Sequence, residues 1–230
     1  MATAHAASSL APVLRVLPPA QRRFASTALR PRPRGTTAKR PAPARRFIPE
    51  AAERFIGPKG QLLTTRENVD FIVANDLEPD NGTMARFTPG PEMKRIAADF
   101  GVALAFSPRH VIHPFDLRAF DPRGHPLAAM KRAQLARKIH EDSLWIIMTS
   151  AGGVSAVVRS MTQNKLVKEL HLALEAMGYR SGTGRGPTKE IRGTFWVTIF
   201  DPVKAAGQSA ERFGKTVAAA LDQECSRRRS

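Results

Sequence analysis

The sequence of 230 residues is poor in cysteine and in long apolar runs, and each shortage excludes a class of protein. A single cysteine, Cys225, excludes an intrachain disulfide and a cysteine-built zinc site, and it suits a reducing compartment. No stretch approaches the roughly 18 apolar residues that a membrane-spanning helix needs, and the longest apolar runs, such as 144–148, have the length of a strand. We therefore expect no membrane partner.

Acidic residues are missing from the first 49 positions, which hold ten Lys or Arg. The whole chain carries 36 basic and 20 acidic residues, so the 26 basic residues after position 49 face all 20 acidic ones and leave that part at +6. A basic surface favours a polyanionic partner, because neutralised phosphates release their counterions. An ordinary soluble basic surface would give the same count.

The composition of residues 1–24 is typical of a mitochondrial presequence, with Arg15, Arg22 and Arg23 and no acid. The segment Arg22-Arg23-Phe24 before Ala25 also resembles matrix-processed presequences, in which an arginine precedes an aromatic residue at the cut. We predict cleavage between Phe24 and Ala25 and location in the mitochondrial matrix. A basic nuclear or nucleolar tail is the alternative.

Residues 25–49 are predicted to be a disordered basic arm. Alternating prolines in this segment deny helix and sheet hydrogen bonding. Its arginines and lysines would thread along a phosphate backbone and become ordered on binding.

Apolar periodicity divides the rest into three parts and predicts an α/β (α+β) fold, a two-layer sandwich with helices over one face of a sheet. The first part, 50–110, is a small α/β region with a turn between 54–56 and 61–65, helices at 66–75 and 92–100 and a strand at 102–106. The second, 114–202, is a β-α-β-α-β-β domain with strands at 115–120, 144–149 and 194–200 and helices at 126–140 and 162–177. A C-terminal helix at 204–225 and a basic tail occupy 203–230.

A glycine-rich segment at 180–192 is the strongest candidate for a contact with RNA. Its glycines would let the backbone approach a polyanion, and its spacing matches neither the P-loop nor the dinucleotide fingerprint. A flexible solvated loop is the alternative. Together with the two central helices, it gives these predicted RNA-binding cations: Lys131, Arg132, Arg137, Lys138, Arg159, Lys165, Lys168, Arg180, Arg185, Lys189 and Arg192. Trp145 and Trp196 are expected in the core in preference to stacking on bases.

No pattern in the chain predicts catalysis. His110 and His113, with Asp116 and His125 nearby, form the only cluster that suggests a metal, but Pro114 prevents the two histidines from sharing a helix face. The residues around Ser150 lack the flanks of a nucleophile elbow. We predict a protein that is not an enzyme and that uses no metal, cofactor or small-molecule substrate.

The second region resembles the C-terminal domain of bacterial-type translation initiation factor three. The resemblance rests on the predicted element order from 115 to 202, and on Pro187-Thr188-Lys189-Glu190-Ile191-Arg192-Gly193 before a strand that ends at Asp201-Pro202. It implies a factor that binds rRNA in the small mitoribosomal subunit, blocks premature subunit joining and monitors initiator tRNA, by binding alone.

This sequence departs from the family in three places. Ala151-Gly152-Gly153 replaces an arginine-rich turn, the Glu-Gly-Arg order is altered, and the family has no final helix like 204–225. These departures concern the RNA-contact residues more than the fold. A structural mitochondrial ribosomal protein, bound permanently among rRNA, would have the same basic tail and compact α/β body and is the alternative function. An RNA-processing hydrolase ranks last, because no paired carboxylates or metal ligands converge in sequence.

Overall fold

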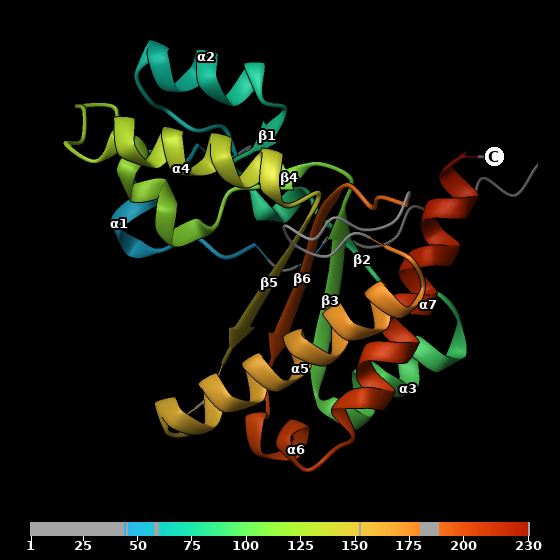
Figure 1. Ribbon diagram of the computed structural model, residues 1–230. Helices are drawn as coiled ribbons and strands as arrows, with labels where there is room; N and C mark the ends of the chain where they lie inside the picture. The colour runs from blue at the N-terminus through green and yellow to red at the C-terminus, as the bar shows by residue number, and fades with distance from the viewer. Residues whose placement is uncertain (1–43, 45, 58–59, 152, 180–188, 230) are drawn as a thin grey trace, which may run out of the picture. The chain divides into compact units, whose positions relative to one another are not determined.

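A four-stranded sheet lies at the centre of the computed structural model, which describes residues 44, 46–57, 60–151, 153–179 and 189–229 (Figure 1). Its strands, in spatial order, are β2 (Ala85–Arg86), β3 (Val102–Ser107), β6 (Gly193–Ile199) and β5 (Leu144–Ser150). β3 is antiparallel to both β2 and β6, whereas β5 is parallel to β6. Parallel neighbours need a crossover, and α5 (Ala156–Ala176) supplies it.

One face of this sheet forms the main core. Alternate side chains of the strands, such as Leu104, Phe195 and Val197, pack against α3 (Gly90–Phe100), α5 and α7 (Ala210–Arg229). Figure 1 shows these three helices on the same side of the sheet. The arrangement buries the apolar stripe of each helix, which is the main source of stability for a fold of this kind.

A second group of elements packs where β5 begins. It comprises α1 (Glu50–Glu53), α2 (Arg66–Ala74), β1 (Leu77–Glu78), η1 (Asn81–Thr83), β4 (His110–Val111), η2 (Pro114–Phe120) and α4 (Ala128–Glu141). β1 and β4 pair in parallel as a separate two-stranded sheet. Leu117, Phe120, Leu135 and Trp145 join η2, α4 and β5 in a second apolar cluster.

Most predicted elements are confirmed. The helices predicted at 66–75, 92–100 and 126–140 correspond to α2, α3 and α4, and the strands at 102–106, 144–149 and 194–200 correspond to β3, β5 and β6. α3 ends at Gly101, whose φ of +61° is the left-handed conformation that favours glycine at this position. The mixed α/β class is therefore confirmed.

The strand predicted at 115–120 is wrong, because η2 is a 3₁₀ helix. Buried Pro114, Leu117 and Phe120 recur every three positions, which is the repeat of a 3₁₀ helix and not of a strand. Proline at the helix start and the His113 ring, whose Nδ1 accepts a hydrogen bond from the Phe115 N–H, favour the turn. The sheet order therefore differs from the β-α-β-α-β-β topology that the sequence predicts.

Three other boundaries change. α5 begins six residues before the predicted start at 162, because Ser155 caps it through a hydrogen bond from the Val158 N–H. The helix predicted at 204–225 is two helices, α6 (Pro202–Ala206) and α7, divided at Gly207. The turn between 54–56 and 61–65 is reduced to an isolated antiparallel bridge between Ile56 and Leu62.

Regions 50–110 and 114–202 are not separate domains. β2 and β3 come from the first region and β5 and β6 from the second, and all four form one sheet. Pairing between β3 and β6 joins residues that are separated by about two fifths of the chain, so local periodicity could not reveal it. Within the part of the chain that the structure describes, no helix is long and apolar enough to cross a membrane.

Candidate nucleic-acid interface

Most of the α4 cations that were predicted to bind RNA form ion pairs with carboxylates of this protein. The Lys131 Nζ lies 2.8 Å from Asp116 Oδ1, and the Arg137 Nε lies 3.6 Å from Glu141 Oε1. Arg132 donates to Asn68 on α2 at 2.5 Å and also pairs with Glu67. Because Asn68 is buried, Arg132 holds α4 to α2, and a structural role explains its charge better than RNA binding does.

Lys138 makes a cation–π contact with an aromatic ring. Its Nζ lies 4.6 Å from the centroid of Trp145, and burial lowers the pKa of the ammonium. Trp145 is itself buried, as is Trp196, so both tryptophans pack in the interior as expected. The remaining α4 candidate for a free phosphate contact is therefore Arg137, whose exposed i,i+4 pair with Glu141 contributes little.

The α5 cations are more accessible. Lys165 and Lys168 are exposed and three residues apart on the helix, so they share one side of it. Among the described residues, neither has an ion pair with a carboxylate, and Arg159, which is half-buried, has none either. This side of α5 presents two lysines that form no ion pair with a described carboxylate.

The glycine-rich segment is described only at its end. Arg180 and Arg185 lie outside the described residues. Lys189 places its Nζ 5.6 Å from the Tyr179 ring centroid, and Arg192 is exposed just before β6. Arg192 and Lys138, predicted on different elements, both lie near enough to His110 to lower the pKa of its ring.

A hollow of about 430 Å³ opens where β5 begins. Its lining includes Lys138 and His171 together with the carboxylates of Asp142 and Glu175. Negative charge beside the single lysine makes this hollow a poor receptor for phosphate. Nor does the described part of the chain contain a group of three His, Cys, Asp or Glu residues that could hold a metal ion.

A row of aromatic rings, which no sequence pattern indicated as a site, runs from the sheet to the surface. His113 stacks on Trp196 with ring centroids 6.0 Å apart and planes at 12°, and Phe115 stacks on His113 at 5.5 Å and 25°. Phe47 meets Phe115 edge-on at 5.7 Å and 63°. We call Phe47, His113, Phe115 and Trp196 the aromatic row.

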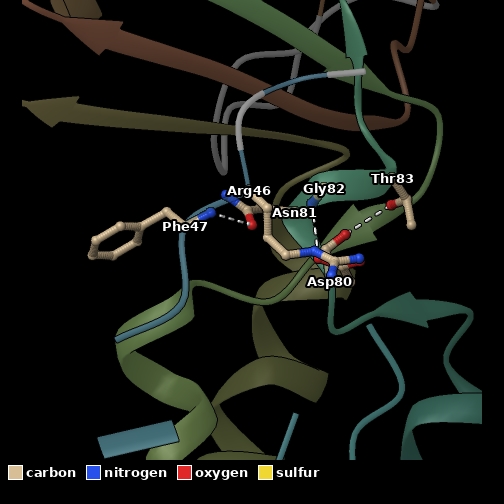
Figure 2. Close-up of polar contacts among 6 residues, drawn as sticks. All are labelled: Arg46, Phe47, Asp80, Asn81, Gly82 and Thr83. Atoms are coloured by element: carbon tan, nitrogen blue, oxygen red, sulfur yellow. Dashed lines mark hydrogen bonds and ion pairs between the residues drawn. The ribbon is translucent and has the colours of Figure 1, made fainter. Parts of the chain in front are cut away.

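Phe47 belongs to the predicted disordered arm, but contacts hold it to the folded body. The Phe47 N–H donates to Asn81 Oδ1 at 3.1 Å, and Arg46 pairs with the buried carboxylate of Asp80, which also accepts from the Gly82 N–H (Figure 2). Ala44 donates its N–H to the Met84 carbonyl. The arm boundary predicted at residue 49 is therefore too late, and Figure 2 shows the Phe47 ring pointing away from the Asp80 loop.

The sequence offered one signal for this row. His113-Pro114-Phe115 combines a capping side chain, a helix-starting proline and an aromatic residue. The apolar residues that follow recur every three positions, which indicates a 3₁₀ helix with Phe115 on its outer side.

Comparison with known proteins finds no protein-family model, no curated protein and no solved structure that matches this chain.

Proposed function

We propose that this chain is an RNA-binding protein of mitochondrial translation, an initiation-factor-three-like protein that binds the small mitoribosomal subunit. The observation that carries the proposal is the acid-free segment at 25–49, which keeps seven Lys or Arg after cleavage at Phe24 and is joined to a folded body that is itself basic. Such a segment gives affinity for any phosphate backbone, because each neutralised phosphate releases counterions. rRNA is the phosphate-rich partner that this charge fits best.

The surface of α5 supports the same proposal. Lys165 and Lys168 are exposed on one side, with no carboxylate partner among the described residues, so they can contact phosphates without first breaking an ion pair. Binding would need no cofactor. The family resemblance suggests initiator tRNA as a further partner. Cleavage after Phe24 and location in the matrix belong to this proposal, and N-terminal sequencing of the protein recovered from mitochondria tests both.

The element order favours the factor only in part. α4, β5, α5 and β6 follow one another as the family resemblance requires, whereas η2 stands where the family has its first strand. That replacement favours the alternative, a structural mitochondrial ribosomal protein. A protein that is a permanent part of the ribosome has no need to keep the first strand of the initiation-factor domain. An RNA-processing enzyme has no comparable support.

Sedimentation of the tagged protein from mitochondrial lysate separates these functions. A reversibly bound factor should migrate with the small subunit at low salt and leave it at moderate salt, because its contacts are mainly electrostatic. A structural ribosomal protein should stay bound through the same wash. A protein that never migrates with ribosomal particles, even at low salt, would refute both.

A further inference from the structure

Phe115 is exposed because of its position on η2. Positions 114, 117 and 120 of this 3₁₀ helix face the interior, so the next register, 115 and 118, faces outward. Phe115 is 53% exposed, and Phe47, beside it, is 46% exposed. Two phenylalanines in contact, each with about half of its surface in water, form an exposed aromatic patch, whereas Phe200, at 50% exposure, lies outside the aromatic row.

The rings form the end of an ordered stack. Trp196, His113 and Phe115 are related by small interplanar angles, and the inner members are held by β6 and by the hydrogen bond from the Phe115 N–H to His113 Nδ1. The outer end of the stack is the exposed Phe115 ring, and Phe47 forms a side wall inclined at 63°. Another planar ring could continue the stack without any rearrangement of the rigid part.

A cation lies beside the exposed rings on η2. Arg118 follows Phe115 by three residues, so the two side chains lie one above the other on η2, and Arg118 is exposed with no ion pair among the described residues. Asp116, next to Phe115, forms an ion pair with Lys131 at 2.8 Å, so these two side chains add no net charge beside the rings. Arg46, directly before Phe47, pairs with Asp80, so its charge is compensated. Because Arg118 lies beside two exposed rings, a planar ligand that carries phosphate fits this site better than an apolar peptide does.

We infer that Phe115 and Phe47 form a stacking site for an unpaired nucleobase of single-stranded RNA, with Arg118 placed to contact the adjoining phosphate. Aromatic side chains interleaved with cations are the usual means by which proteins hold unpaired bases. A base in a duplex is stacked on its neighbours and is not available to Phe115, so this site selects single-stranded segments. The inference rests on the proposed RNA binding and adds which part of the RNA is recognised.

The test measures the affinity of the full chain for a single-stranded RNA oligonucleotide and for a blunt RNA duplex of the same length, by fluorescence anisotropy. Phe115→Ala should weaken single-strand binding by at least about fivefold, the lower end of the range for one lost base stack. Phe115→Tyr should keep the affinity, because it keeps the π-face. Phe200→Ala is the matched control, since Phe200 is 50% exposed at the other end of β6 and outside the aromatic row.

Three results would overturn the inference. Equal affinities of Phe115→Ala and Phe200→Ala would remove Phe115 from the interface, and full affinity in Phe115→Leu would indicate an apolar contact, as with a protein partner, instead of stacking. Either result leaves the proposed RNA binding intact if the wild type binds RNA. Failure of the wild type to bind either RNA at low salt would refute the proposed function together with the site. Far-UV circular dichroism of each variant verifies that the fold is unchanged.

Discussion

His110 is expected to make the stability of this protein depend on pH. Its ring is 1% exposed and stacks on Trp145 with centroids 4.5 Å apart, at the junction between the sheet and α4. Burial lowers the pKa of His110 to about 4, and the positive charges of Arg192 and Lys138 act in the same direction. The folded protein therefore holds this ring neutral where an exposed histidine would already be protonated.

The sign and size of the effect follow from the two pKa values. An unfolded chain protonates His110 near pH 6.5, whereas the folded chain does so only near pH 4, so protons favour the unfolded state between these values. The stabilising contribution of the neutral ring is complete above pH 6.5 and is lost as the pH falls toward 4. The difference between the two pKa values corresponds to a loss of about 3 kcal/mol at most.

Urea unfolding followed by far-UV circular dichroism, at several pH values between 6.5 and 4, measures this loss. His110→Phe is the matched variant, because it keeps an aromatic ring on Trp145 and cannot take up a proton. Between pH 6.5 and pH 4, the free energy of unfolding should fall less in the variant than in the wild type. Carboxylates and other histidines also titrate in this range, but they affect both proteins equally. If the two proteins lose stability in parallel, His110 is not the group responsible and the argument from its burial is wrong.

Two further predictions concern α5. The Cβ of an alanine at Gly214 in α7 would lie 2.4 Å from the carbonyl oxygen of Glu169, so Gly214→Ala should lower the free energy of unfolding by about 1–3 kcal/mol in urea titrations. Gly207→Ala, whose Cβ would be 3.6 Å from its nearest neighbour, should not destabilise, and equal stabilities would contradict the close helix contact. Replacing Lys165 and Lys168 together with Ala should lower the slope of log RNA affinity against log salt by up to about two, without a change in circular dichroism. An unchanged slope would place the phosphate contacts elsewhere, for example on the segment between α5 and β6.

Helices with a continuous apolar stripe were predictable from the sequence. In α3, Met93, Ile96 and Phe100 are spaced for one face, and Gly101 ends the helix at the predicted residue. Local hydrogen bonding and side-chain spacing decide such an element, so the information lies within a few turns of chain. The Ser155 cap that begins α5 early is also local, but a serine occurs at too many other positions to be diagnostic alone.

η2 was mispredicted because two periods fit the same seven residues, 114–120. Phe115, Leu117 and Ala119 alternate as in a strand, while Pro114, Leu117 and Phe120 recur as in a 3₁₀ helix. Burial decides between them, and burial depends on packing of η2 against α4, which follows it in sequence, and against α1, which lies about 60 residues earlier. The pairing of β3 with β6 could not be predicted for a similar reason, because it depends on contacts between residues far apart in the chain.

The charges of the candidate interface were countable from the sequence, but their availability was not. Lys131 and Arg132 are adjacent on α4, and both find carboxylates on other elements, Asp116 on η2 and Glu67 on α2. Lys165 on α5 has no such described partner. Whether a cation can reach a phosphate is therefore a property of the packing between helices, which single-sequence patterns do not contain.

Phosphate and base contacts in this protein should respond differently to salt, and that difference connects the two proposals. Contacts by the arm and by α5 release counterions, so they weaken steeply as salt rises. Stacking on Phe115 releases few ions, so its contribution to the binding free energy should be nearly constant over the same range. The ratio of wild-type to Phe115→Ala affinity should therefore stay level while both affinities fall. A ratio that approaches one as salt rises would mean that Phe115 acts by positioning Arg118 or another cation, and not by holding a base.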